Sequence, residues 1–420
     1  MNIVGDTKEK LILFGIQTQK QTENQVWASL DELEELVKTA GGEVVCKVFQ
    51  KVDRINAAHY LGSGKVQEIK DLIEENEATG VVADDELSPM QMRNLEELLE
   101  TKVMDRTMVI LDIFAGRARS KEGKIQVEMA QLRYNLTRLT GKGTELSRLA
   151  GGIGTRGPGE QKLETDRRHI RERIGQLKKE LKEIEKHRDL IRERREKSGT
   201  PVVAIVGYTN AGKSTLLNAI SGSDIYAEDK LFATLDPTTR KVTLPAGSDV
   251  LVTDTVGFIR KLPHHLVKAF YSTLEEIKYA DIILHVIDAS SEDIDSHQKI
   301  VHETLTDLGA NDKPTIAVLN KMDVFEGDSV HVITPVDSQV KVSAKTKENI
   351  NELLEEIQEL LKHSLQKMNL LIPYEDGDIL SYIYENGEAF TEEHMAEGTY
   401  IEGYIAKDKF YMVKDFSIKD

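Results

Sequence analysis

The sequence predicts an α/β protein whose sheets are rich in parallel strands and flanked by helices. Three observations lead to this prediction. Short apolar runs alternate with stretches of helical spacing in the first part of the 420 residues. A long charged stretch then carries apolar residues at heptad spacing. Beyond it, an apolar run leads into a glycine-rich loop and a further helical stretch, which is typical of a strand–loop–helix unit in a parallel sheet.

Residues 1–115 are expected to form an N-terminal α/β domain. Leu30, Leu33 and Leu36 recur at helical spacing, and the pair Gly41 and Gly42 ends this helix because glycine favours helix ends. Strands are predicted at residues 11–14, 44–49, 81–83 and 108–113, with a further helix at 95–99. Strands that alternate with helices indicate a mainly parallel sheet.

The segment Leu61–Lys65 has the glycines and lysine of a phosphate-binding loop but not its full pattern. His59 stands where the first glycine of that pattern is required. We therefore predict a turn before a helix that begins near Val66. A contact between this turn and a nucleotide or RNA phosphate is left open.

Cysteine content and hydropathy favour a cytoplasmic protein. The single cysteine, Cys46, excludes an intrachain disulfide and a cysteine-based zinc site. No apolar run approaches the ~18 residues that a membrane-spanning helix needs. The first residues also lack the apolar core and the cleavage signature of a signal peptide.

Residues 116–199 are predicted to form a helical hairpin. Helical spacing starts near Ile125, and five glycines and a proline then crowd residues 151–159, where glycine raises the entropic cost of any regular structure. After this glycine loop a heptad seam runs to a helix end near Ser198. Its members are Ile170, Ile174, Leu177, Leu181, Ile184 and Ile191. We expect the seam to pack on the helix before the loop within a monomer, with a second copy of the chain as the alternative partner.

The charge of the chain is unevenly distributed. The whole chain has 55 Lys and Arg against 72 Asp and Glu, a net charge of −17 that argues against a basic coat for nucleic acid. Residues 102–197, however, hold 25 basic and 15 acidic residues, a net of +10, so the remainder carries −27. A basic helical region beside a glycine-rich tip favours contact with a polyanion over a merely solvated coiled coil.

The loop after the apolar run 202–206 has the complete phosphate-loop pattern in a strand–loop–helix context. Its backbone amides and the following helix start would surround phosphates. Lys213 would neutralise the β and γ phosphates as a catalytic group, and the Ser214 hydroxyl would bind Mg²⁺. The residues expected to contact the nucleotide are Gly207, Tyr208, Thr209, Asn210, Ala211, Gly212, Lys213, Ser214 and Thr215.

Two downstream motifs predict guanine as the base. Asp323 follows a predicted strand, and its carboxylate would accept from N1–H and the 2-amino group of guanine, which adenine lacks. The motif comprises Asn320, Lys321, Met322 and Asp323. A second loop, with Ser343, Ala344 and Lys345, would meet the guanine oxygen through its backbone. The order of the three motifs therefore favours GTP and GDP over adenine nucleotides.

Two segments between these motifs are expected to sense the γ phosphate. A strand delivers Asp254 next to Mg²⁺, and the Gly257 amide would bond the γ phosphate. In the other segment Thr234 is expected to bind Mg²⁺, with Thr238 as the alternative. Nucleotide contacts are thus expected for Asp254, Thr255, Val256 and Gly257 and for Phe232, Ala233, Thr234, Leu235 and Asp236, with Thr234 and Gly257 also counted as catalytic.

Phe258 stands directly after Gly257, where Ras-like enzymes have a glutamine that orients water. A phenylalanine cannot do so, and we expect slow turnover of the isolated protein until another element supplies the missing group. A binding partner is one source. The alternative is a K⁺ ion held near the phosphates by Asn210, whose other role is to stabilise a turn.

Residues 365–420 suggest a small C-terminal α+β domain. A strand is predicted at 370–372, a helix at 379–384 and a strand pair at 399–406 and 409–413. The surface of this part is acidic, and we interpret it as a docking module. The predicted domains are therefore 1–115, the N-terminal α/β domain; 116–199, the helical hairpin; 200–364, the GTP-binding domain; and 365–420, the C-terminal domain.

The sequence resembles the HflX family of GTPases, which is related to the Obg-type translation GTPases. The resemblance covers nearly the whole chain and is most specific in the glycine loop with its basic continuation, residues 151–168, and in the stretch 232–238. It implies a GTPase that binds the large ribosomal subunit and splits stalled or hibernating ribosomes in its GTP form. It also implies that the hairpin tip reaches rRNA through Arg156, with Lys162, Arg167 and Arg168 in the basic stretch.

Two functions stay open at this point. The first is an RNA-directed GTPase that remodels, splits or assembles ribosomes. The second is a GTP-switched module that binds protein or dimerises through its seam without touching rRNA.

Overall fold

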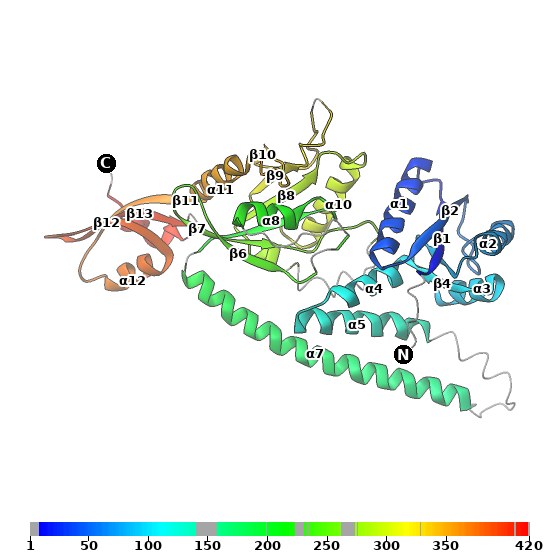
Figure 1. Cartoon of the computed structure of the whole chain (residues 1–420). Helices are drawn as coiled ribbons and strands as arrows, with labels where there is room; N and C mark the ends of the chain where they lie inside the picture. The colour runs from blue at the N-terminus through cyan, green and yellow to red at the C-terminus, as the bar shows by residue number, and fades with distance from the viewer. Residues whose placement is uncertain are drawn as a thin grey trace, which may run out of the picture. The chain divides into compact units, whose positions relative to one another are not determined.

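The computed structural model describes residues 8–139, 158–198, 200–222, 231–232, 235–261, 274, 276–327, 329–406 and 409–418 (Figure 1). The chain divides into two compact units. The first unit comprises Met1–Lys182, Glu228–Asp236 and Val256–Thr273, and the second comprises Glu183–Ala227, Pro237–Thr255 and Leu274–Asp420. No helix among the described residues is long and apolar enough to cross a bilayer.

The first unit contains a four-stranded parallel sheet in the order β2-β1-β3-β4. Its strands are β1 (Lys10–Gln17), β2 (Glu43–Lys51), β3 (Gly80–Ala83) and β4 (Lys102–Asp105). The helices between and after them are α1 (Glu23–Thr39), α2 (Ser63–Asn76), α3 (Pro89–Leu99) and α4 (Arg106–Arg117). The predicted alternation of strands and helices and the parallel sheet are confirmed.

The predicted strand at residues 108–113 is wrong, because these residues lie in α4. The strand before it is β4, and its last residue, Asp105, begins the helix by accepting a hydrogen bond from the Met108 amide at 2.9 Å. In an unbroken apolar run, the spacing of the apolar residues does not distinguish a buried strand from a helix that is buried on several sides. Helix α2 likewise begins at Ser63, three residues before the predicted start.

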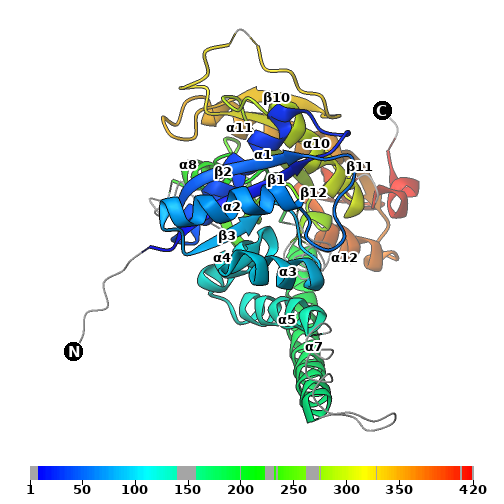
Figure 2. The same cartoon turned by 90° about the vertical axis from the view of Figure 1, so that its right-hand side faces the viewer.

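The described part of the hairpin is antiparallel, as predicted. Helix α5 (Lys121–Arg138) lies beside the first half of α7 (Pro158–Ser198) in both views (Figures 1 and 2). Arg173 of α7 forms an ion pair with Glu128 of α5 at 2.7 Å, and Arg167 donates to the Leu139 carbonyl at 3.2 Å. The most buried apolar residues on this part of α7 are Leu163, Ile174 and Leu177. The predicted glycine loop lies mostly in residues 140–157, outside the described residues.

The second unit contains a six-stranded sheet in the order β10-β9-β8-β5-β7-β6. Among its described strands, β6 (Thr238–Thr243) alone runs antiparallel to the others. The parallel strands are β5 (Val202–Gly207), β7 (Asp249–Asp254), β8 (Ile282–Asp288), β9 (Thr315–Asn320) and β10 (Ser338–Lys341). The helices are α8 (Lys213–Ser221), α10 (Ile294–Asp307) and α11 (Ile350–Ser364).

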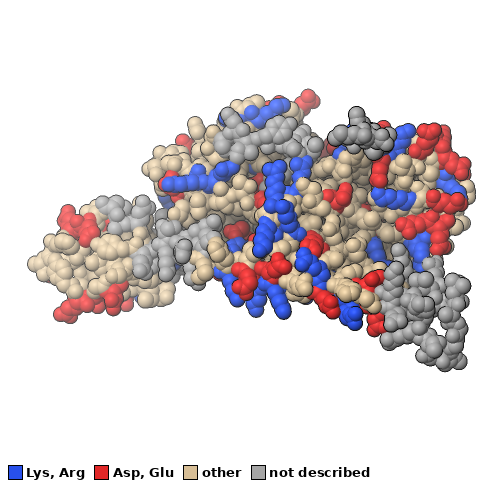
Figure 3. All heavy atoms as spheres, turned by 60° about the horizontal axis from the view of Figure 1, so that its bottom comes forward, with Lys and Arg blue, Asp and Glu red and all other residues tan. Residues whose placement is uncertain are grey.

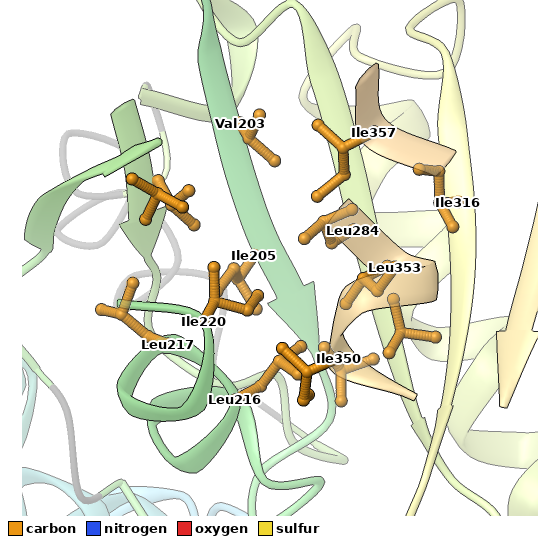
Figure 4. Close-up of a cluster of buried hydrophobic side chains, with 14 of the residues drawn as sticks. Val203, Ile205, Leu216, Leu217, Ile220, Leu284, Ile316, Ile350, Leu353 and Ile357 are labelled. Carbon is orange, nitrogen blue, oxygen red and sulfur yellow. The ribbon is translucent and has the colours of Figure 1, made fainter. Parts of the chain in front are cut away.

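Helices α8 and α11 bury their apolar faces against this sheet (Figure 4). The cluster joins β5, β8 and β9 to both helices through Val203, Ile205, Leu216, Leu217, Ile220, Leu284, Ile316, Ile350, Leu353 and Ile357. Removal of this apolar surface from water stabilises the unit and places the loops at the carboxyl ends of the strands at one edge.

The C-terminal part contains a three-stranded antiparallel sheet in the order β11-β13-β12. Its elements are β11 (Leu365–Ile372), α12 (Gly377–Asn386), β12 (Gly387–Met395) and β13 (Gly398–Ala406). The α+β class and the first three predicted elements are confirmed, but the predicted last strand at 409–413 is wrong, since two short 3₁₀ helices follow β13, at Phe410–Met412 and Lys414–Phe416. The hairpin partner of β13 is β12. This strand was not predicted, because its acidic residues interrupt the alternation of apolar and polar residues that is typical of a strand.

Candidate nucleotide site

The phosphate-loop motif joins β5 to α8, as its sequence context predicts. Gly207 has φ +156°, and a Cβ atom there would lie 2.4 Å from the Val286 carbonyl oxygen. Gly212 has φ +92°, and its Cβ would lie 2.3 Å from the Asn320 amide nitrogen. Only glycine fits at these two positions, and the resulting loop leaves its backbone close to the neighbouring strands.

Lys213 lies buried in the first turn of α8. Its Nζ donates to the carbonyl oxygens of Gly207 at 3.1 Å and Tyr208 at 2.7 Å. Burial lowers the pKa of Lys213 to about 8, although the negative charge of Asp254 opposes this change. The ammonium group is thus held inside the loop, at the start of a helix that attracts anions.

Ser214 and Asp254 meet at the end of β7. The Ser214 hydroxyl donates to the Asp254 carboxylate at 2.7 Å, and Asp254 is almost fully buried. Thr238, the alternative magnesium ligand, pairs with Asp254 in the β6–β7 register. A hydroxyl and a carboxylate are oxygen ligands of the kind that Mg²⁺ prefers. Among the described residues no group of three or more His, Cys, Asp or Glu could hold a metal ion.

The two base-recognition loops are joined to the phosphate loop by Asn320. Its side chain donates to the Ala211 carbonyl at 2.8 Å and accepts from the Ala344 amide at 3.0 Å. Asp323 accepts a hydrogen bond from the Ser343 hydroxyl at 2.7 Å. The structure therefore brings together three motifs, of which the first lies more than 100 residues from the other two in the sequence.

The remaining predicted contact residues of the second unit differ in their burial and contacts. Thr255 is buried and donates to the Ile205 carbonyl at 2.7 Å. Met322 packs against a small buried cluster beside β9, and Lys345 is exposed. Asn210 is exposed with φ +61°, and Thr215 is half-buried in α8.

Five predicted contact residues lie in the described part of the first unit: Phe232, Leu235, Asp236, Val256 and Gly257. Phe232, Leu235 and Val256 are buried. Ala233 and Thr234 lie outside the described residues. Phe258, the residue in place of the glutamine, is buried with 3% exposure.

Three family models match the chain in succession. They are described as GTP-binding GTPase N-terminal (residues 27–115), GTP-binding GTPase Middle Region (117–195) and 50S ribosome-binding GTPase (202–321). A GTPase HflX of Lacrimispora saccharolytica is 52% identical over 98% of this chain and 96% of its own length. A GTPase HflX of Escherichia coli is 42% identical over 90% of this chain and 89% of its own.

The chain belongs to the HflX family of GTPases. Like that family, it binds GTP and GDP and hydrolyses GTP. Among solved structures, a GTP-binding protein of Sulfolobus solfataricus in complex with GDP is 26% identical, with a TM-score of 0.43, and the match covers 84% of this chain and 99% of that one.

Two residues that contact the predicted motifs, Asp288 and His297, were not among the predicted contact residues. Asp288, at the end of β8, forms an ion pair with Lys321 at 2.7 Å and accepts from the Ser290 hydroxyl at 2.6 Å. The ring of Tyr208 stacks on His297 of α10 with centroids 3.7 Å apart. The position of Asp288 at the carboxyl end of a strand next to β5 is a signal that could have identified it.

The four predicted RNA-contact residues differ in their surroundings. Arg156 and the side chain of Lys162 lie outside the described residues. Arg167 is half-buried and donates to the Leu139 carbonyl, which connects the two arms of the hairpin. The side chain of Arg168 is 67% exposed and lies 3.8 Å from Glu172, so it is available to a partner.

Nucleotide affinity is expected to fall as the pH rises from 7 to 9. Phosphates bind the charged form of Lys213 and raise its pKa, so binding above pH 8 requires the uptake of a proton. The dissociation constant of GDP should rise by up to about tenfold per pH unit above 8. Fluorescence titration of Lys213→Arg is the control, because arginine stays charged and removes this part of the slope. Equal slopes for the two proteins would contradict the prediction.

Proposed function

We propose that this GTPase binds the large ribosomal subunit and, in its GTP form, remodels or splits ribosomes. The observation that carries the proposal is the basic hairpin, with a net charge of +10 in residues 102–197 of an otherwise acidic chain. The match to a 50S ribosome-binding GTPase model over residues 202–321 supports it. Lys and Arg side chains are intermixed with Asp and Glu on the face drawn in Figure 3, so this face has no uniform basic coat.

The positions of the residues support specific roles toward GTP. Lys213 holds the β and γ phosphates, and the Gly257 amide bonds the γ phosphate. Asp323 selects guanine, with Asn320, Lys321 and Met322 in its motif and Ser343, Ala344 and Lys345 in the facing loop. Ser214 and Asp254 would hold Mg²⁺, and their close approach fits that ion. Thr234, which lies outside the described residues, would be the third ligand. When bound, Mg²⁺ supplies positive charge that stabilises the transferred phosphoryl group.

The proposed domains are residues 1–115, 116–199, 200–364 and 365–420. The junctions between the matched family models, at residues 115–117 and 195–202, support the first two of these boundaries. We also place the protein in the cytoplasm. We propose that it acts as a monomer, because Ile174 and Leu177 of the seam are buried in the part of α7 where Arg173 pairs with Glu128 of α5.

Hydrolysis by the isolated protein is expected to be slow and about tenfold faster in K⁺ than in Na⁺. Phe258 cannot orient water, and a cation held by Asn210 can stabilise charge on the phosphates. Asn210→Gly is the matched variant, since Asn210 has φ +61°, which glycine adopts freely. Phosphate release in the two salts measures the effect. Equal rates would leave Asn210 with a turn role only and a binding partner as the source of stimulation.

Co-sedimentation with purified ribosomal subunits tests the proposed function. The protein is expected to pellet with the large subunit in the presence of a non-hydrolysable GTP analogue and less with GDP. Charge reversal at Arg156 and Arg168 should weaken pelleting about tenfold or more at moderate salt, because each phosphate that the protein no longer neutralises keeps its counterions. Arg167 is left unchanged because of its hydrogen bond to Leu139.

The matched control is Lys179→Glu, which reverses an exposed charge on the same helix, farther from the glycine loop. It should leave pelleting within twofold of the unaltered protein, and GTP affinity should stay unchanged in all variants. Pelleting that is independent of the nucleotide would overturn the ribosome proposal. Dimers in analytical ultracentrifugation without subunit binding would instead favour the protein-binding module.

A further inference from the structure

Two segments of the GTPase region belong to the compact unit of the N-terminal sheet. They are Glu228–Asp236 and Val256–Thr273, which include residues 232–236 and 256–257 of the segments proposed above to sense the γ phosphate. Three of their described side chains, Phe232, Asp236 and Lys261, contact residues from the first 125 positions of the chain. These interactions are of three different physical kinds.

Asp236 is bound to the start of α5. Its carboxylate accepts from the backbone amides of Arg119 at 2.9 Å and Ser120 at 2.7 Å, and also from the Ser120 hydroxyl. Ser120 is the N-cap of α5, where its hydroxyl oxygen accepts from the Gly123 amide at 2.8 Å. A carboxylate at this place satisfies free amides and interacts favourably with the helix dipole.

A steric contact explains why a glycine, Gly123, stands in the first turn of α5. A Cβ atom at this position would lie 2.5 Å from a carboxylate oxygen of Asp236. Alanine is the better helix former, so glycine here weakens α5 taken by itself. The residue therefore fits the approach of Asp236 and not the needs of the helix.

Phe232 and Lys261, which contact residues of the N-terminal sheet and its helices, both have a left-handed backbone conformation. Phe232 has φ +55° and packs edge to face on Phe114 of α4, with ring centroids 4.7 Å apart. Lys261 has φ +54° and forms ion pairs with Asp84 and, at 2.7 Å, with Asp85, just after β3. Bulky residues rarely adopt this conformation and need surrounding interactions to hold it.

The acidic cluster after β3 is built to receive a cation. Asp84 is 3% exposed and also pairs with Arg106 at 2.6 Å, while Arg106 pairs with Glu32 at 2.6 Å. Without Lys261, Asp84 would keep its ion pair with Arg106, and Asp85 would lose the ammonium group that lies 2.7 Å from its carboxylate. A buried carboxylate that loses its partner is strongly disfavoured, so the cluster depends on the residue that Lys261 supplies.

We propose that Asp236 and Lys261 are positioning residues that couple the bound nucleotide to α5 and to the N-terminal sheet. The packing of Phe232 and the close approach of Gly123 to Asp236 belong to the same set of contacts. The inference rests on the proposed phosphate-sensing role of the two segments. A rearrangement of either segment with the nucleotide changes its interaction with the cap of α5 or with the acidic cluster. By thermodynamic linkage, interactions that differ between nucleotide states change the ratio of the affinities for GTP and GDP.

The test is the ratio of dissociation constants for a non-hydrolysable GTP analogue and GDP, measured by fluorescence titration on the full-length protein without ribosomes. Gly123→Ala and Lys261→Met are expected to shift this ratio about fivefold or more. Lys261→Arg keeps the charge and should restore most of the ratio. Gly123→Ala added to Asp236→Ala should shift the ratio much less than Gly123→Ala alone, because the shortest approach of the added Cβ is to the Asp236 carboxylate.

Two control variants match these changes. Gly116→Ala lies in α4, where an added Cβ meets no atom within 4 Å, and Lys102→Met breaks an exposed pair with Glu9 at 3.0 Å. Both should leave the ratio within twofold, and melting temperatures show which variants fold. Unchanged ratios in folded Gly123→Ala and Lys261→Met proteins would overturn the inference. Such a result would leave the ribosome proposal intact, because pelleting with the large subunit is measured separately.

Discussion

Lys213→Ala is expected to lower kcat/KM for GTP by about 10³-fold or more, the largest effect expected of any single substitution in this protein. The ammonium group is buried in the phosphate loop, where it interacts with phosphate charge in a low dielectric. The variant should nevertheless fold as well as the unaltered protein. Burial disfavours the charged lysine, whose pKa is lowered to about 8, so its removal relieves a cost in the nucleotide-free state.

Phosphate release and nucleotide titration measure this effect, with thermal melting as the test of folding. Lys241→Ala is the control, because Lys241 is an exposed lysine of the same unit that pairs with Asp249 at 2.7 Å. It should keep both activity and affinity. A Lys213→Ala protein with more than a tenth of normal activity would show that the phosphates bind elsewhere.

Asp323→Asn is expected to reduce GTP affinity by about 10²-fold or more and to confer binding of xanthosine triphosphate. The carboxylate accepts two N–H groups of guanine, whereas an asparagine amide would present a donor to one of them. Xanthine has an oxygen in place of the 2-amino group of guanine, and this oxygen would accept a hydrogen bond from the asparagine amide. The Ser343 hydroxyl, now 2.7 Å from the Asp323 carboxylate, can still donate to the asparagine oxygen, so the loop should keep its shape.

Competition titrations with GTP, xanthosine triphosphate and ATP check this exchange of specificity. Asp312→Asn, an exposed change of the same kind in the second unit, should leave the order of affinities unchanged. If Asp323→Asn bound GTP as tightly as before, the base would have to be read by another group.

The elements that the sequence predicted well depend on neighbours along the chain. The phosphate loop needs glycine where φ is positive, and the strand before it and the helix after it have clear apolar patterns. The heptad steps predicted a long helix that packs on the helix before it, and the pairs between α5 and α7 confirm that arrangement in the described part. The contrast between the basic hairpin and the acidic remainder was likewise present in the sequence alone.

The wrong predictions concern segments whose local pattern is ambiguous. Residues 108–113 form a helix because Asp105 caps it and because the surrounding core buries it on several sides. Strand β12 was missed because its glutamates do not alternate with apolar residues, and its pairing with β13 decides its conformation. In both places tertiary interactions outweigh local propensity.

The class of the fold, the nucleotide motifs and the location of the basic hairpin could be recognised from residues close to one another in the chain. Only the tertiary structure placed Asp288 against Lys321, and brought Asp236 to the cap of α5 and Lys261 to Asp84 and Asp85. The physical reason is the range of the interactions. Capping, glycine conformation and apolar periodicity act within a few residues, whereas these ion pairs and hydrogen bonds join side chains that only the folded chain brings together.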